Sequence, residues 1–541
     1  MCSLAFGVLS ESREPAPIRA GRAPRPGEYA AGFDALHYGI RLTLPATESV
    51  IDGTTEIQLA LAAGAPDILP LDLTGLQVTG VRVDGTASRF VHDEGRLLIP
   101  LPRPGPPGSR IRVAVDYRGT PDDGLIIRNN VHGHRAAFAD NWPNRARFWF
   151  PALDYPADKA TASFTIVAPT GWDVVANGVR TAVPTTIHQP DGSLERRFEW
   201  SITQPISTYN MVFGAGTFQV QTVGRPCFSD GRCVDVTTWL FPESTGKGSP
   251  SFRRAAEMVD YFSRLIAPFP YDKLAHVQSS TQFGGMENAS AISYSDRALA
   301  DGRDIESTVA HETAHQWFGD AVTEEDWPHV WLSEGFATYF GALFFEHADG
   351  EAVFRRMMEE NRRQIVASKR NDKPIVDATE RDLFQLLNTN TYQKAAWVLH
   401  MLRGIVGDEK FFDGVRRYYR GHEHSTGLTV DVQRAMEAAS GMKLDDFFDQ
   451  WLSHQGYPRF RVSSQWRPEQ RTATVVVEQA QSESWPTFKM PLTIELSTPG
   501  GALRQRVDVD ERRERYAFQL DFPPTGVVLD PDGWLLKEVV R

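Results

Sequence analysis

The chain has 541 residues, of which 41% are hydrophobic and 23% charged, and its net charge is −12. At about 150 residues per domain this length predicts three or four folded domains, and the proportions are those of an ordinary globular protein. The basic residues are scattered, and no apolar run reaches the roughly 18 residues of a membrane helix, so neither nucleic acid nor membrane is an expected partner.

The first part of the chain is predicted to be a short arm followed by a β domain. Residues 1–29 carry Pro and Arg with little apolar periodicity and are expected to form a poorly ordered arm. From residue 30 to residue 222, apolar and polar residues alternate, for example at Tyr38, Ile40 and Leu42, with turn clusters such as PRPGPPGS between the runs. This pattern is typical of an antiparallel β domain.

The pattern changes to a helical one in the middle of the chain. Between residues 223 and 456, segments such as SFRRAAEMVDYFSRLI and SEGFATYFGALFFEHADG carry apolar residues at three- and four-residue spacing. After Gly456, the alternation of strands returns and continues through residues 457–541. The sequence therefore predicts an α+β multidomain protein with an N-terminal antiparallel β domain, a mainly helical centre and a smaller C-terminal β domain.

The cysteines bear on the compartment of the protein. Three cysteines exclude a disulfide-dense scaffold, but Cys227 and Cys233, in PCFSDGRC, lie six residues apart and would close one loop if oxidised. Two reduced thiols are the favoured interpretation, because the first residues show no basic lead of a signal peptide and the cytoplasm is reducing. A periplasmic or secreted protein is the alternative.

The segment HETAH carries residues suited to a catalytic metal. His311 and His315 are four apart in a helical pattern, so both imidazoles project from one face and suit one zinc ion. Glu312 is rotated by about a quarter turn from His311, which places it beside a metal-bound water as a general base. Glu334, in the first turn of a helix predicted to begin at Ser333, offers the third ligand. For the HExxH motif alone, two ordinary helix histidines are the alternative.

Several motifs together carry a family resemblance. HETAHQWFGD followed by WLSEGFATYF, with 18 residues between His315 and Glu334, resembles the aminopeptidase N family of gluzincin zinc peptidases. Residues 147–166 are similar to a segment of that family's β domain, and YQKAAWVLHML is similar to the segment that holds its catalytic tyrosine. The resemblance covers roughly residues 30–541 and implies a thermolysin-like catalytic domain and a C-terminal β sandwich.

The resemblance implies a zinc metallopeptidase mechanism. One Zn²⁺ ion would be bound by His311, His315 and Glu334, and Glu312 would be the general base. Tyr392 would donate a hydrogen bond to the oxyanion of the tetrahedral intermediate. The expected activity is hydrolysis of N-terminal residues from peptides by a metal-activated water.

Substrate binding is assigned by the same resemblance to GGMEN, which is similar to the family's exopeptidase signature. Gly284, Gly285, Met286 and Glu287 would bind the substrate, with the carboxylate of Glu287 paired with the free α-amine. Met286 suggests that neutral or apolar N-terminal residues are accepted. The expected partners are therefore peptides with a free N-terminus, bound by a monomer or a weak homo-oligomer.

Two departures from the family's pattern bear on this site. Where the family offers Gln or Glu as a second contact for the substrate amine, this chain has Trp142, and Asp140 or Asn141 is the alternative through a local shift. Many members carry a large helical C-terminal domain, whereas residues 457–541 are predicted to be strands, so a more open cleft is expected.

Acidic residues between the two zinc helices are candidates for orienting the imidazoles. They are Asp320, which stands where the family commonly has Asn, and Glu324, Glu325 and Asp326. Most of this acidic run is predicted to be solvated.

Other functions of the same fold stay open at this stage. A zinc endopeptidase is possible if the amine site is incomplete, and an epoxide hydrolase would need an elongated apolar channel. A non-catalytic interaction scaffold is the third alternative, since a fold alone does not determine a function.

Overall fold

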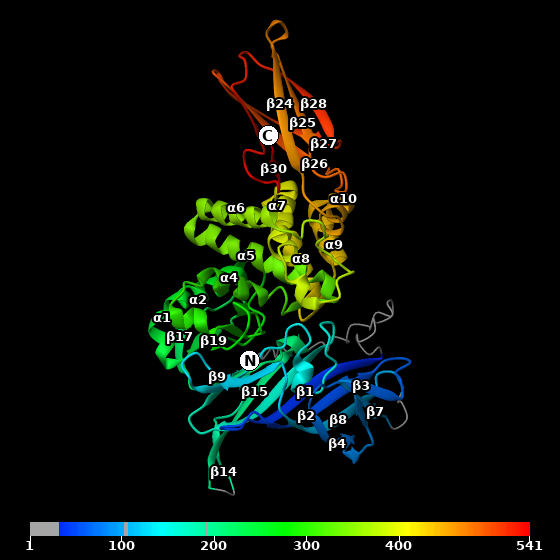
Figure 1. Ribbon diagram of the computed structural model, residues 1–541, viewed down its shortest axis with the longest axis vertical. Coiled ribbons are helices and arrows are strands. Elements are labelled where there is room, and N and C mark those ends of the chain that lie inside the picture. The colour runs from blue at the N-terminus through cyan, green and yellow to red at the C-terminus, as the bar shows by residue number, and fades with distance from the viewer. Residues whose placement is uncertain (1–31, 102–105, 190–191, 541) are drawn as a thin grey trace, which may run out of the picture.

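The computed structural model describes residues 32–101, 106–189 and 192–540 (Figure 1). The predicted N-terminal arm, residues 1–29, lies outside these residues. In Figure 1 an N-terminal β part, a mainly helical part and a C-terminal β part follow one another along the long axis of the molecule. The predicted fold class is therefore confirmed, while the residue boundaries between the parts stay predictions.

The N-terminal part is built on a sheet of nine strands. Burial alternates along its strands, because successive side chains point to opposite faces and one face packs on the core. All its recorded pairings are antiparallel except that of β1 with β11, which are joined by a long connection. The strands are β1 (Phe33–Thr43), β2 (Ile51–Leu61), β4 (Gln77–Val83), β5 (Thr86–Ala87), β8 (Arg110–Gly119), β11 (Lys159–Pro169), β13 (Val179–Arg180), β14 (Thr185–His188) and β15 (Leu194–Ser207).

Two smaller sheets complete this part. The first consists of β3 (Ile68–Asp72), β6 (Val91–Asp93) and β7 (Arg96–Pro100). The second consists of β9 (Leu125–Asn129), β10 (Arg135–Ala139), β12 (Asp173–Ala176) and β16 (Phe213–Gly216). The segment after β10 leads directly to Trp142, which lies at the boundary with the helical part.

The central part begins with a sheet of five strands, in the order β17-β18-β19-β21-β20. Its strands are β17 (Gln219–Gly224), β18 (Asp235–Leu240), β19 (Lys273–Ser279), β20 (Gly285–Met286) and β21 (Ala291–Ser295). The edge strand β20 comes from the GGMEN segment and pairs antiparallel with β21, so that Met286 lies opposite Ser293. A short parallel pair, β22 (Val322–Glu324) and β23 (Ser425–Gly427), lies outside this sheet.

Helices make up the rest of the central part. They are α1 (Thr245–Gly248), α2 (Ala255–Leu265), α3 (Asp296–Asp301), α4 (Glu306–His315), α5 (Trp331–Asp349), α6 (Glu351–Ala367), α7 (Ala395–Val406), α8 (Asp408–His422), α9 (Thr429–Ser440) and α10 (Asp445–Phe448). The helix predicted from Ser333 begins two residues earlier, and most of α5 is buried because other helices surround it (Figure 1). Among the described residues, no helix is both long enough and apolar enough to cross a membrane.

The C-terminal part consists of two small sheets. One holds β24 (Arg459–Arg467), β25 (Thr472–Gln479), β28 (Arg513–Gln519) and β30 (Glu538–Val539). The other holds β26 (Met490–Thr498), β27 (Gly501–Val509) and β29 (Gly526–Leu529). Val475 and Val477 of the first sheet and Ile494 and Leu496 of the second are buried in one apolar core, which is the packing of a β sandwich.

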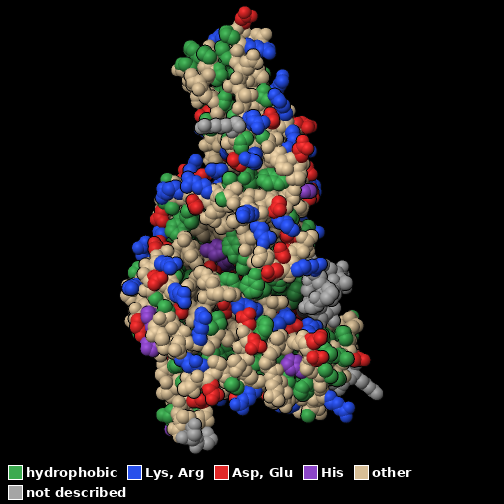
Figure 2. Space-filling model, viewed as in Figure 1, with side chains coloured by type: hydrophobic (Ala, Val, Ile, Leu, Met, Phe, Trp, Pro, Cys, Tyr) green, Lys and Arg blue, Asp and Glu red, His purple; other side chains and the backbone are tan. Residues whose placement is uncertain are grey.

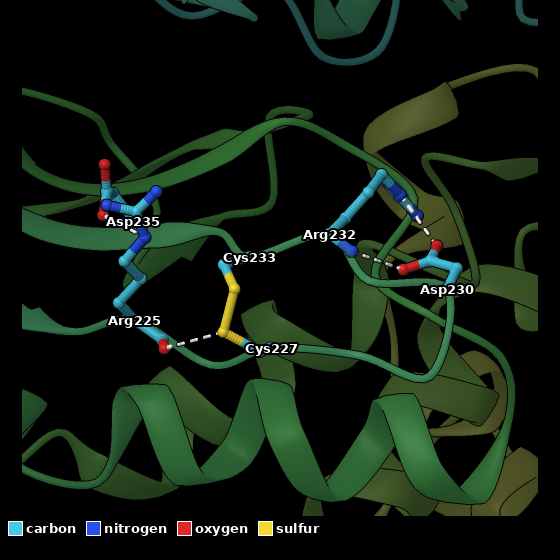
Figure 3. The surroundings of a disulfide bond; sticks show 6 residues. All are labelled: Arg225, Cys227, Asp230, Arg232, Cys233 and Asp235. Atoms are coloured by element: carbon cyan, nitrogen blue, oxygen red, sulfur yellow. Dashed lines mark hydrogen bonds and ion pairs between the residues drawn. A yellow bond between two sulfur atoms is a disulfide. The ribbon is translucent and has the colours of Figure 1, made fainter.

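The hairpin between β17 and β18 contains a disulfide bond. Cys227 and Cys233 are antiparallel bridge partners with Cα atoms 4.0 Å apart, and their sulfur atoms are bonded (Figure 3). The favoured prediction of two reduced thiols is therefore wrong for this structure. The sequence spacing alone could not show that the hairpin register places the two residues directly opposite each other.

Removal of this disulfide is expected to have a limited effect. In the chain-entropy model, a loop of this size contributes about 2 kcal/mol to the free energy of unfolding. The double variant Cys227→Ser, Cys233→Ser should therefore lose no more than that, as measured by urea unfolding followed by circular dichroism. Alkylation of free thiols in the wild type, read by mass spectrometry, is the control for oxidation. A loss well above this value would mean that the hairpin supports the packing of the whole central part.

Candidate active site

Helices α4 and α5 bring three ligand atoms together. Nε2 of His311 lies 3.0 Å from Nε2 of His315, and each nitrogen lies 3.3 Å from Oε2 of Glu334. Burial opposes ionisation of Glu334, but the two histidines outweigh it and lower the pKa of this carboxyl. Ligand atoms around a tetrahedral zinc ion are about 3.4 Å apart. The donor set therefore fits one zinc ion and leaves a fourth position for water or substrate.

The approach of the two helices depends on a glycine. A Cβ atom at Gly341 would lie only 3.3 Å from the backbone nitrogen of His311, so a larger residue would push α5 away from α4.

The ring of His315 is oriented through Nδ1, which lies 3.0 Å from the carbonyl oxygen of Phe318 and 3.0 Å from Oγ of Ser333. When Nδ1–H donates to that carbonyl, the lone pair of Nε2 is available to a metal.

The acidic run between the helices is not solvated as predicted. Asp320, Glu324 and Asp326 are buried, because the N-terminal part packs over them. Lys159 Nζ donates to the carbonyl oxygen of Asp320 at 2.8 Å, and Tyr155 Oη donates to Asp326 at 2.9 Å. The sequence does not show these two contacts, since each joins residues more than 150 positions apart.

Two further carboxyl groups, those of Glu287 and Glu312, lie beside the metal ligands. An oxygen of each lies with a ring nitrogen of His315 in a group whose members are within 4.8 Å of one another. Burial, and then the charge of Glu334, raise the pKa of Glu287 to about 7, and burial with the nearby carboxylates raises the pKa of Glu312 well above its ordinary value. A cationic group bound between them would therefore be strongly favoured.

Two local features support this arrangement. A Cβ atom at Gly285 would overlap the carboxyl of Glu312, so a larger residue in the edge strand β20 would require this side chain to move. Tyr392 lies on a π-helical turn, Asn390–Lys394, directly before α7. Its ring stacks on His311 with centroids 5.9 Å apart, and burial and the charge of Glu334 raise the pKa of its hydroxyl well above the ordinary value. The hydroxyl is therefore a proton-bearing donor.

One cavity of about 330 Å³ collects the predicted residues. The residues predicted as metal ligands, as catalytic groups and as substrate contacts all line it. They are His311, His315, Glu334, Glu312, Tyr392, Gly284, Gly285, Met286 and Glu287. Figure 2 shows a hollow with histidine and apolar side chains on this face of the molecule.

Sequence reasoning missed several residues that line the same cavity. They are Phe283, Ser307, Thr308, Thr338, Leu387 and Gln393. Helical periodicity was an available signal for three of them. Ser307 and Thr308 precede His311 by one turn, and Thr338 follows Glu334 by one turn. Leu387 lies in an irregular segment far along the chain, and no sequence signal indicates it.

Trp142 differs in its surroundings from Asp140 and Asn141, the predicted alternatives for a second amine contact. Its side chain lines the cavity, whereas its two predecessors have structural roles. Asp140 accepts a hydrogen bond from Arg145 at 2.7 Å. Asn141 accepts one from Trp149 at 2.8 Å, and its amide nitrogen donates to two main-chain carbonyls. A local shift of Asp140 or Asn141 toward the cavity would break these buried bonds, which leaves Glu287 as the predicted partner of a substrate amine.

Two family descriptions match the chain. The Peptidase M1 N-terminal domain matches residues 34–210, and the Peptidase family M1 domain matches residues 251–451. A β domain before a helical domain that carries two histidines and a glutamate on adjacent helices defines a gluzincin metallopeptidase. The chain belongs to peptidase family M1, the aminopeptidase N-like gluzincins, as the sequence motifs predicted.

Several relatives carry aminopeptidase names. A leucyl aminopeptidase of Saccharolobus solfataricus is 24% identical, over 86% of this chain and 59% of its own length. A glutamyl aminopeptidase of Sus scrofa is 28% identical, over 60% of this chain and 35% of its own length. The crystal structure of Legionella pneumophila aminopeptidase A in complex with aspartic acid has a TM-score of 0.82 at 16% identity, covers 97% of this chain, and shows the same fold. The chain matches 61% of that structure, so it spans less than two thirds of each of these relatives.

Proposed function

We propose that this protein is a zinc-dependent aminopeptidase, which hydrolyses the N-terminal residue from peptides. The observation that carries this proposal is the position of the Glu287 carboxylate, within 4.8 Å of the Glu312 carboxylate and of a ligand nitrogen of His315. A carboxylate so close to the metal ligands can pair with the ammonium group only of the residue whose carbonyl is attacked. The cavity therefore selects the first peptide bond.

Five residues that line the cavity have roles in the proposed reaction. His311, His315 and Glu334 would hold a zinc ion, which when bound would supply Lewis acidity toward the scissile carbonyl and lower the pKa of water. Glu312 takes a proton from the attacking water and delivers it to the leaving amine. Tyr392 donates a hydrogen bond to the carbonyl oxygen as negative charge develops on it. Water attacks directly, so no covalent bond forms between the peptide and the enzyme.

Metal removal gives the first test. Hydrolysis of alanyl and leucyl aminomethylcoumarin amides is expected to stop after treatment with a chelator and to return with one equivalent of zinc. The same amides capped with an N-acetyl group should be hydrolysed at least about a hundredfold more slowly, because the cap removes the charge that Glu287 binds.

The other functions of the fold predict different results. Equal hydrolysis of capped and free substrates would indicate an endopeptidase. Bound zinc without any amide hydrolysis would favour the epoxide hydrolase, and a protein that binds no zinc would be the interaction scaffold.

The wall of the cavity suggests which N-terminal side chains are accepted. Trp142, Phe283, Met286 and Leu387 give it an apolar surface, and among the described residues no Lys or Arg lines it. An acidic side chain would find no counter-charge there. We expect kcat/KM for leucyl and phenylalanyl amides to exceed that for the glutamyl amide by at least about tenfold. The variant Leu387→Arg should narrow this ratio, and a wild type that cleaves the glutamyl amide fastest would contradict the expectation.

The disulfide bears on the proposed compartment of the protein, and the assembly state stays a prediction. The sequence favours the cytoplasm, whereas a disulfide such as Cys227–Cys233 is typical of oxidising compartments. The disulfide thus supports the periplasmic or secreted alternative. Peptides with a free N-terminus are the proposed partners, and a monomer or a weak homo-oligomer stays the prediction for the assembly.

A further inference from the structure

One buried side chain connects the metal-binding helix to the segment that carries Glu287. Gln316 follows His315 directly and is 0% exposed. Its Nε2 donates to the carbonyl oxygen of Glu287 at 2.6 Å and to Oδ2 of Asp320 at 2.7 Å. Its Oε1 accepts from the backbone nitrogen of Ser290 at 2.7 Å. Gln316 therefore holds both ends of residues 287–290 against the end of α4.

The orientation of this amide is determined by its partners. A main-chain carbonyl can only accept a hydrogen bond and a main-chain N–H can only donate one, so the Gln316 nitrogen must face Glu287 and its oxygen must face Ser290. Asp320 takes the second hydrogen of the amide nitrogen. All three polar contacts are buried, and the loss of one would leave an unsatisfied buried polar group.

The N-terminal part holds the same segment from the other side. The side-chain amide of Asn177 donates to the carbonyl oxygen of Ala289 at 2.6 Å, and the backbone nitrogen of Gly178 donates to Oγ of Ser290 at 2.7 Å. These bonds hold the residues after Glu287. Gln316 holds the carbonyl of Glu287 itself and joins it to the helix that carries two metal ligands.

We propose that Gln316, oriented by Asp320, is a positioning residue that sets the distance between the Glu287 carboxylate and the metal ligands. The inference rests on the proposed function, in which this distance must match the span from the α-amine to the first carbonyl of a peptide. A displacement of about 1 Å at such a site can lower the rate about a hundredfold. Which peptide bond is placed at the metal ligands therefore depends on a residue that does not itself line the cavity.

The test measures the contribution of the amine to binding. Leucine hydroxamate carries both the α-amine and a metal-binding hydroxamate, and 4-methylpentanohydroxamate lacks the amine. The ratio of their Kd values, measured by calorimetry on the zinc-loaded protein, isolates the amine contact. In Gln316→Met this ratio should fall at least about tenfold, while the Kd of the analogue without the amine and the zinc content stay unchanged.

Two variants serve as controls, and a second variant of Gln316 is held in reserve. Gln278 is also fully buried and makes three hydrogen bonds, to Phe241, Ser244 and Asp296, so Gln278→Met matches the loss of buried bonds away from Glu287 and should leave the ratio unchanged. Asp320→Asn keeps an oxygen that accepts the bond from Gln316 and should preserve the ratio. If Gln316→Met does not fold, the smaller Gln316→Leu decides, because it also has no group that can donate to the carbonyl of Glu287.

The possible results distinguish the proposed recognition of the amine from the positioning role of Gln316. A wild-type ratio near one would overturn the proposed amine recognition itself. A high wild-type ratio that persists in both Gln316 variants would leave the aminopeptidase proposal in place and overturn the positioning role. A ratio that falls equally in Gln278→Met would show that any lost buried amide has the same effect, which also overturns it.

Discussion

The variant Glu312→Gln is expected to lower kcat/KM for a leucyl amide by about 10²–10⁴-fold while the zinc content stays at one equivalent. The replacement keeps the size of the side chain but cannot accept a proton from water. Because Glu312 lies outside the proposed ligand set of His311, His315 and Glu334, the ion should remain bound. Initial rates of amide hydrolysis, measured together with zinc content by atomic absorption, check both parts of this expectation.

The variant Glu312→Asp is the companion measurement. It retains a carboxylate but withdraws it by one methylene, so an intermediate rate is expected if the group acts as a base. Rates of Glu312→Gln within about tenfold of the wild type would assign the base to another residue. Loss of zinc in Glu312→Gln would mean that this carboxyl supports the metal site and not proton transfer.

The features of the site that follow from the geometry of single helices were predictable from the sequence. The four-residue spacing of His311 and His315 and the position of Glu334 in the first turn of α5 follow from helical geometry alone. The motif GGMEN became interpretable through its resemblance to a family, and the structure brings it to the same cavity as an edge strand. Local periodicity thus indicates which residues share a face of one element.

Contacts between distant segments were not predictable in this way. The acidic run at Asp320 looks solvated in the sequence, but packing against Lys159 of the β part and against Gln316 of the central part buries Asp320. The hydrogen bond between Gln316 and the carbonyl of Glu287 joins the end of α4 to the residue after β20, and no local pattern encodes this contact. Hairpin register likewise determines the Cys227–Cys233 pairing. Tertiary packing supplies the information that the sequence pattern lacks.

The variant Glu287→Gln is expected to lower kcat/KM for free-amine substrates by about a hundredfold. Glu287 is 5% exposed, and a charge-assisted hydrogen bond to a buried partner contributes up to about 3 kcal/mol, which corresponds to this factor. The loss should be specific to the amine: N-acetylated amides, which never form the ion pair, should keep their low rate, so the ratio of free to capped hydrolysis should fall by the same factor. Steady-state kinetics on both substrates measure this ratio.

Glu324→Gln provides the matched control for this variant. Glu324 is also a buried carboxyl of the central part, 1% exposed, but it does not line the cavity. Its replacement should change kcat/KM by less than about threefold, because its effect on the amine is only a weakened long-range charge interaction. If Glu287→Gln were as mild as Glu324→Gln, the ammonium group would be bound by another group of the cavity, such as the Glu312 carboxyl, and the selection of N-termini would have another origin. A large loss in Glu287→Gln alone would instead assign that selection to this single carboxylate, as the structural roles of Asp140 and Asn141 require.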